Sequence, residues 1–271
     1  VFNVAWSLFW CWQVRVFTKL IKVLIPGETK ELVSKSHLDN RLIATPSIAL
    51  EACRKELSRM ASIGTSMIES QVAVILKKKP FKEAKEVWEL EKVVNEINRE
   101  TIIYLKNMYN INLTEIESKM VMNYMHVSSD LERLGDHATN LYEVAEHMFE
   151  NQTHLAKENI ENLAKLFQLV NENLNKATEI LSSSQESFSQ DELDEIYRKA
   201  KIREKEVDKL SEEIKENNVS VYIKSNSKEI NIDNAVVVND IIINLERVGD
   251  HSYNIIKYFT VPPEKDKFLA H

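Results

Sequence analysis

Two ten-residue stretches of the chain carry the same acidic side chains at the same spacing. Residues 131–140 read LERLGDHATN and residues 245–254 read LERVGDHSYN, so seven of ten positions are identical at an offset of 114. In each copy a glutamate precedes an aspartate by four residues, which places both carboxylates on one face of a helix. Like charges at this spacing repel each other unless a cation lies between them. The two pairs, Glu132 with Asp136 and Glu246 with Asp250, therefore point to cation binding.

A further acidic pair lies one predicted helix upstream of each stretch. Glu204 and Asp208 precede the second stretch, and Glu91 and Asn95 hold the matching positions before the first. If the two helices of each half are neighbours about 8–10 Å apart, their polar side chains converge. The repulsion between the carboxylates of such a cluster is relieved by protonation or by a bound cation. The candidate metal ligands are Glu91, Asn95, Glu132, Asp136, Glu204, Asp208, Glu246 and Asp250.

The chemistry of these side chains restricts the metal. All of them offer oxygen atoms, which suit hard cations such as iron(III), manganese, magnesium or calcium and argue against zinc. A carboxylate-bridged metal enzyme of the ferritin-like type would need histidine three residues after glutamate. His137 and His251 instead follow the glutamates by five residues. This spacing disfavours the enzyme, but it leaves that interpretation and a metal-free helical scaffold with solvated acidic edges open.

The two stretches also share a glycine. The chain has only four glycines, and Gly135 and Gly249 stand at the same position of the two copies. Both lie within apolar patterns of helical period, where glycine costs about 1 kcal/mol relative to alanine. The sequence therefore predicts a close approach of a neighbouring helix, or of a ligand, to the backbone at both glycines.

The elements that must position these residues are helices. The chain of 271 residues contains only nine glycines and prolines together, which favours an all-α protein. Helix-start signals occur at Thr45-Pro46 and at two capping boxes, which begin at Thr114 and Ser189. The apolar periodicity predicts two sets of three helices. They cover residues 45–76, 82–109, 114–150, 153–181, 189–217 and 231–258, and an irregular connection is expected at 218–230.

This pattern predicts an all-α fold of two tandem three-helix bundles. The corresponding organisation is an apolar segment at 1–26, a linker at 27–44, a first repeat at 45–150, a second repeat at 151–259 and a tail at 260–271. The net charge of −7 and the lack of a basic stripe with interleaved aromatics argue against nucleic acid as a partner. Two cysteines, Cys11 and Cys53, form no disulfide framework and indicate a reducing compartment.

The N-terminal segment has the composition of the end of a membrane domain. Residues 1–14 carry no charge and include three of the four tryptophans, and Arg15, Lys19 and Lys22 follow. Tryptophan beside basic residues is typical of the cytoplasmic membrane interface. Fourteen residues are too few to span a bilayer, which takes about 20. The last part of a membrane span, an interfacial anchor and a buried amphipathic helix are the open interpretations. The initial valine fits either a piece of a longer chain or an unusual start codon.

The repeated LER-x-GDH-x-x-N motif resembles the signature of PhoU proteins. The resemblance extends over residues 38–259 and implies two tandem three-helix bundles whose acidic motifs bind multinuclear metal clusters, with iron or manganese favoured. It carries the ligand roles onto Glu91, Glu132 and Asp136 in the first bundle, and onto Glu204, Asp208, Glu246 and Asp250 in the second. Asn95 departs from the family pattern, which has a carboxylate there, so we expect a weaker first site.

Two further stretches are similar to the cytoplasmic PhoU-like tail of bacterial sodium/phosphate cotransporter-family proteins. They are the segment LDNRL at 38–42 with ATPSIAL at 44–50, and the opening VFN. This resemblance implies a non-enzymatic, metal-binding domain in phosphate uptake and homeostasis on the cytoplasmic side of the cell membrane. The partners it implies are a phosphate transporter membrane domain, the membrane surface and a further copy of the chain.

Overall fold

The computed structural model describes residues 36–77, 79–184, 187–224 and 232–260. These residues form six α-helices and two short 3-10 helices, and no strand. The elements are η1 (Asn40–Ala44), α2 (Pro46–Ile75), η2 (Phe81–Ala84), α3 (Val87–Tyr109), α4 (Glu115–Glu150), α5 (Lys157–Ser182), α6 (Gln190–Lys224) and α7 (Ile232–Thr260). The predicted all-α fold of two three-helix repeats, α2–α4 and α5–α7, is confirmed. The apolar segment at 1–26 and residues 261–271 of the predicted tail lie outside the described residues.

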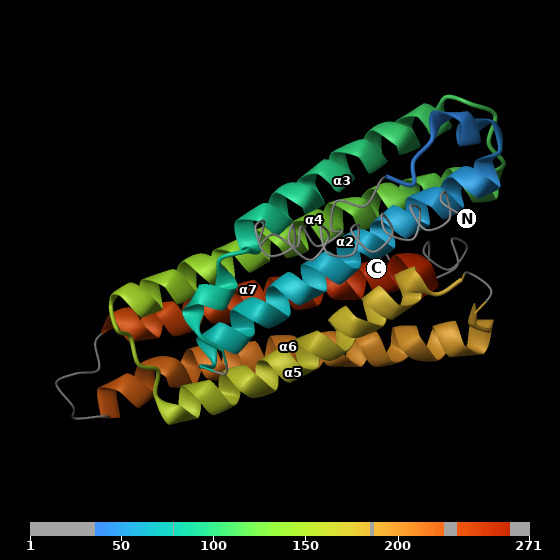
Figure 1. Ribbon diagram of the computed structural model, residues 1–271. Helices are drawn as coiled ribbons and strands as arrows, with labels where there is room; N and C mark the ends of the chain where they lie inside the picture. The colour runs from blue at the N-terminus through green and yellow to red at the C-terminus, as the bar shows by residue number, and fades with distance from the viewer. Residues whose placement is uncertain (1–35, 78, 185–186, 225–231, 261–271) are drawn as a thin grey trace, which may run out of the picture. The chain divides into compact units, whose positions relative to one another are not determined.

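Four helices form the centre of the molecule. Helix α4 packs against α2 and α7, and α5 packs against α2 and α7 (Figure 1). Helix α3 covers α2 and α4 on one side, whereas α6 covers α5 and α7 on the other. The buried residues follow the apolar periodicity of each helix, for example Leu131, Leu134 and Leu141 on α4. Each helix that carries a repeated motif, α4 or α7, is therefore central, and the helix with the upstream acidic pair packs on its outer side.

The two motif helices run antiparallel and are related by an approximate two-fold axis. His137 Nδ1 lies 3.0 Å from Asn244 Oδ1, and His251 Nδ1 lies 2.8 Å from Asp130 Oδ1. Each histidine of one motif thus contacts the residue that immediately precedes the other motif. The two imidazole rings stack between these contacts, with their centroids 5.5 Å apart. The internal repeat of the sequence is therefore also a repeat of contacts across the interface between the bundles.

The ends of the helices follow local signals in most places. Both predicted capping boxes form, because the hydroxyls of Thr114 and Ser189 accept hydrogen bonds from the backbone amides of Glu117 and Glu192. Helix α6, however, extends to Lys224, whereas the β-branched residues after Asn217 predicted an irregular connection. The contact of α6 with α7 persists at Asn218, whose buried side chain donates to the carbonyl of Ala235 at the start of α7. This tertiary contact anchors α6 at the point where the weak helix propensity of the following residues predicted its end.

The first described residues are bound to the first repeat. Within the predicted linker at 27–44, residues 40–44 form η1, and the amide of His37 donates to the carboxylate of Glu56, which is 1% exposed. The two repeats also meet between α2 and α5. There the buried Arg54 side chain donates to the carbonyl of Leu181, 3.0 Å away, at the end of α5. Among the helices of the described residues, none is both long and apolar enough to cross a membrane.

Candidate metal centre

Three carboxylates of the second repeat converge on one point. Glu204 and Asp208 project from consecutive turns of α6, and Asp250 projects from α7 toward them. One oxygen of each side chain lies within 4.8 Å of the others. Glu204 and Asp250 are half-buried and Asp208 is exposed, so the group is open to ions from solvent. We call Glu204, Asp208 and Asp250 the acidic trio.

The repeated glycine explains how two helices bring these carboxylates so close. A Cβ atom placed on Gly249 would lie 3.4 Å from a γ-carbon of Val207 on α6 and 3.7 Å from Val170 on α5. Gly249 directly precedes Asp250, and Val207 directly precedes Asp208. The contact of Gly249 with Val207 therefore lies at the level of the acidic trio. The predicted close approach to the backbone at the glycines is a helix–helix contact.

The remaining predicted ligand of the second repeat has a different partner. Glu246 accepts a hydrogen bond from Lys215, whose Nζ lies 2.7 Å from its Oε2 atom. Asp250 also has a cation nearby, because Arg247 Nη1 lies 3.3 Å from its Oδ2 atom. Part of the negative charge is thus balanced by basic residues of α6 and α7. The charge of Glu204 and Asp208 has no such direct ion pair among the described residues.

The electrostatics of the acidic trio favour a bound positive charge. Burial and the neighbouring carboxylates Asp208 and Asp250 raise the pKa of Glu204. Partial desolvation by the surrounding side chains and the charge of Glu246 raise the pKa of Asp208. For Asp250, burial and Asp208 raise the pKa, and Arg247 offsets part of this effect. Each carboxylate is thus harder to ionise in the folded protein, and a cation would remove that penalty.

The donor set fits a single hard cation. Two oxygen ligands on opposite sides of one ion are separated by about 4 Å for magnesium and about 5 Å for calcium, because metal–oxygen distances are about 2.1 and 2.3–2.6 Å. The separation of up to 4.8 Å in the acidic trio lies in this range. Three carboxylates leave further coordination positions for water, which hard cations retain readily.

The first repeat places its predicted ligands differently. Asn95 Nδ2 donates a hydrogen bond to Oε1 of Glu91. The amide therefore stabilises the Glu91 carboxylate, which an acid at position 95 would repel. Burial and Asp136 raise the pKa of Glu132 on α4. A Cβ atom on Gly135 would lie 3.5 Å from Val94, which repeats the packing at Gly249. Within the described residues, only the acidic trio brings three potential metal-binding side chains together.

Sequence reasoning missed several polar residues beside the two motifs. Asp130 and Asn244 contact the histidines of the opposite repeat, and they hold equivalent positions directly before each motif. Extending the repeat by one residue would have identified them. Lys215 had no such signal, because it lies eleven residues after Glu204 and meets Glu246 only through the packing of α6 on α7.

The raised pKa values predict an unusual pH dependence for the cation-free protein. A carboxyl whose folded-state pKa is raised keeps its proton where the unfolded chain has lost it, so stability falls as pH rises through this window. Asp250→Asn removes one such carboxyl. In chelator at pH 7 we expect this variant to melt above the parent, by a margin that shrinks toward pH 4, near the ordinary pKa of aspartate. Thermal melts followed by circular dichroism measure this margin, and a margin that grows on acidification would contradict the prediction.

The fold and the sequence profile both have known counterparts. The profile of the PhoU domain matches residues 57–145 and 163–259, which correspond to the two repeats. The structure of PhoU from Pseudomonas aeruginosa is similar, with a TM-score of 0.68 at 18% identity, over 78% of this chain and 94% of that one. The phosphate transport system regulatory protein PhoU from Streptococcus pneumoniae has a TM-score of 0.64 at 18% identity, over 79% and 95%. No curated protein sequence matches the chain. Because the PhoU profile covers both repeats and most of the chain, this protein belongs to the PhoU family.

Proposed function

We propose that this chain is a non-enzymatic regulatory domain in the control of phosphate uptake and that its second repeat binds a hard metal cation. The acidic trio supports the proposal most directly, because it joins Asp250 of the repeated motif to the upstream acidic pair Glu204 and Asp208 in a PhoU-family chain. A protein with similar architecture, from Streptococcus pneumoniae, is titled a phosphate transport system regulatory protein. The proposed cation is iron or manganese, with magnesium and calcium as the other candidates.

The residues of the second repeat suggest what the cation would do. Glu204, Asp208 and Asp250 would hold it between α6 and α7. A cation there links the two helices and removes the repulsion that raises the pKa of these acids. Lys215 would keep Glu246 beside the site, where this carboxylate could exchange its ammonium partner for the metal. Metal binding would therefore stiffen the contact of the outer helix α6 with the central helix α7.

The composition of residues 1–26 supports a location on the cytoplasmic side of the cell membrane. This segment combines an uncharged, tryptophan-rich stretch with basic residues, whereas the whole chain carries a net charge of −7. We propose a phosphate transporter membrane domain of the sodium/phosphate cotransporter family as partner, with the membrane surface nearby. In this arrangement the helical repeats would transmit their cation-bound state to the transporter. A second copy of the chain is a further candidate partner.

Metal binding by the full chain tests the proposal. The protein is stripped with chelator, reconstituted separately with Fe²⁺, Mn²⁺, Mg²⁺ and Ca²⁺, freed of loose ions by gel filtration and analysed for metal content. We expect retention of at least one of these cations, together with a higher melting temperature, because a ligand that binds only the folded state stabilises it by mass action. Zinc serves as the comparison ion and should be retained less well.

Three outcomes separate the proposal from its alternatives. A chain that retains none of the four cations, and whose melting temperature no cation changes, would be a metal-free scaffold. Retention of iron together with oxygen-dependent turnover would instead make it a carboxylate-bridged metal enzyme. Loss of phosphate control in cells expressing a metal-free variant, measured as phosphate uptake, would link the cation to the regulatory function.

A further inference from the structure

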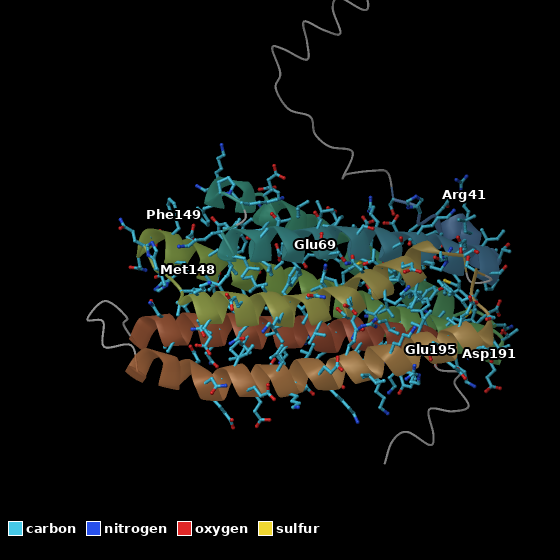
Figure 2. All side chains as sticks on the ribbon, turned by 90° about the horizontal axis from the view of Figure 1, so that it is seen from below. Arg41, Glu69, Met148, Phe149, Asp191 and Glu195 are labelled. Atoms are coloured by element: carbon cyan, nitrogen blue, oxygen red, sulfur yellow. The ribbon has the colours of Figure 1, made fainter. Side chains whose placement is uncertain are left out.

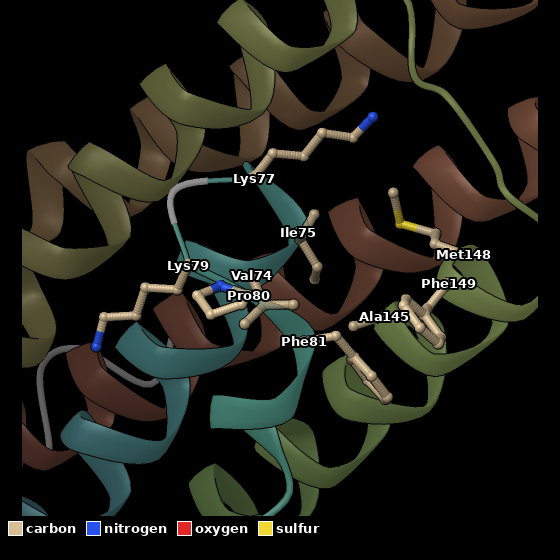
Figure 3. Close-up of a pocket in the computed structure, with 9 residues that line it drawn as sticks. All are labelled: Val74, Ile75, Lys77, Lys79, Pro80, Phe81, Ala145, Met148 and Phe149. Atoms are coloured by element: carbon tan, nitrogen blue, oxygen red, sulfur yellow. The ribbon is translucent and has the colours of Figure 1, made fainter.

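An apolar pocket lies at one end of the first repeat, where α2 and η2 meet the end of α4. Its volume is about 410 Å³, and none of its lining residues belongs to α6 or α7, which carry the acidic trio. Met148 and Phe149 lie at this end of the molecule, and Arg41 and Glu195 lie at the opposite end (Figure 2). The walls are formed by Val74, Ile75, Lys77, Lys79, Pro80, Phe81, Ala145, Met148 and Phe149 (Figure 3). We call this cavity the end pocket.

Stacked aromatic rings lead from the interior of the repeat to the rim of the end pocket. The buried ring of Tyr142 stacks on Phe81 with a centroid distance of 5.5 Å, and Phe81 stacks on Phe149 at 4.9 Å. Phe149 is nevertheless 65% exposed. Trp88 meets Tyr142 edge-on and is 42% exposed. The rim is therefore a contiguous aromatic surface, of a kind that is enriched where proteins bind one another.

A positively charged side chain lies beside this aromatic surface. Lys77 extends along the edge of the end pocket next to Ile75, whereas Lys79 points away from it (Figure 3). Among the described residues, Lys77 has no carboxylate in ion-pair distance. Its backbone has a φ of 55°, a left-handed conformation that favours glycine. Lys85 adds a second cation, with its Nζ 5.8 Å from the ring centroid of Phe81.

We propose that the end pocket binds a segment of a partner protein in which a large apolar side chain is followed closely by a carboxylate. The apolar side chain would enter between Ile75, Phe81 and Phe149, and the carboxylate would pair with Lys77. Charge supports this choice, because Lys77 and Lys79 are among the lining residues and Lys85 lies over the ring of Phe81, in a chain of net charge −7. The volume suits one or two side chains, at the lower end of the range of ligand pockets, about 300–1,000 Å³.

The surroundings favour a peptide over a membrane surface. Glu146 and Glu150 lie on the last turns of α4 beside the aromatic rim, and Glu146 accepts a hydrogen bond from the hydroxyl of Tyr142. A flat anionic bilayer would bring both carboxylates against its headgroups, which repels it. A single carboxylate on a peptide can meet Lys77 without facing them. The shape and charge of the end pocket therefore suit a discrete acidic and apolar segment.

Peptide selection on the full chain tests this proposal without a known partner. A phage-displayed library of random octapeptides is selected on the immobilised protein, and the enriched peptides are synthesised with fluorescein and titrated by fluorescence anisotropy. We expect the enriched peptides to combine leucine or an aromatic residue with aspartate or glutamate. Phe149→Ser and Lys77→Glu should each weaken their binding about tenfold, as the loss of one good contact would.

Matched variants separate the end pocket from general surface effects. Ile116→Ser removes another apolar side chain of α4, which is 73% exposed. Lys92→Glu reverses the charge of an exposed side chain on α3. Both should change peptide binding less than twofold, and circular dichroism should show the same helical content in all four variants. The proposal is overturned if the selection enriches basic or uncharged peptides, if no peptide is enriched, or if Phe149→Ser leaves binding unchanged. Binding of phosphatidylglycerol vesicles that depends on Phe149, without peptide binding, would overturn it in favour of a membrane contact.

Discussion

Replacing Asp250 with alanine is expected to abolish tight cation binding by the second repeat. Asp250 is the only member of the acidic trio on α7, so its removal leaves both remaining acids on one helix. A unit charge 4 Å from a cation contributes about 4 kcal/mol at an effective dielectric constant of 20. We therefore expect affinity to fall by at least 100-fold. Equilibrium dialysis of the full chain against Mn²⁺, with metal content read by elemental analysis, measures the change.

Position 95 supplies the matched controls for this prediction. Asn95→Ala alters the equivalent part of the first repeat, where the amide already satisfies Glu91, and should leave metal content unchanged. Asn95→Asp introduces an acid beside Glu91, and we expect it to add a second, weaker site. Retention of the full metal content by Asp250→Ala would mean that the acidic trio does not hold the cation. A loss in Asn95→Ala as large as that in Asp250→Ala would move the site to the first repeat.

Replacing Gly249 with leucine is expected to destabilise the fold and to weaken the metal site together. A leucine side chain at this position must displace Val207 or Val170, because a Cβ atom on Gly249 would already lie at van der Waals distance from both. Overpacking costs about 1–3 kcal/mol, which exceeds the gain of about 1 kcal/mol from removing a helical glycine. Pushing α6 away from α7 also separates Asp208 from Asp250. Thermal melts in chelator and metal-binding titrations measure the two effects on the same protein.

Alanine at the same position distinguishes close packing from a requirement for glycine itself. Its Cβ atom would lie 3.4 Å from Val207, which is an ordinary contact. Gly249→Ala should therefore be neutral or stabilise by up to about 1 kcal/mol, a rise of about 2–4 °C in melting temperature. Gly135→Leu is the equivalent test in the first repeat, facing Val94. If either leucine variant melted above the parent, the close approach of the helices would not limit the side chain.

The sequence alone determined the class of fold and the level at which the helices meet. Apolar periodicity and the two capping boxes depend on neighbours within a few residues, so they predicted six helices and the starts of α4 and α6. The repeated motif likewise identified the acids and the glycines. A glycine destabilises a helix, so its presence at the same position of both repeats needs a packing reason. Gly249 and Gly135 have that reason in Val207 and Val94.

Only the tertiary structure decided which acids meet one another and which pair with a basic residue. Asp250 joins Glu204 and Asp208, whereas Glu246, four residues earlier on the same helix face, pairs with Lys215. The difference arises along α6, where Lys215 follows Asp208 by seven residues and Glu204 by eleven, and no local pattern encodes which acid of α7 each of them meets. The crossed contacts of His137 with Asn244 and of His251 with Asp130 depend in the same way on the antiparallel register of α4 and α7. Local spacing sets the face on which a side chain lies, but the partner it meets is set by helix packing over distances that the sequence pattern does not contain.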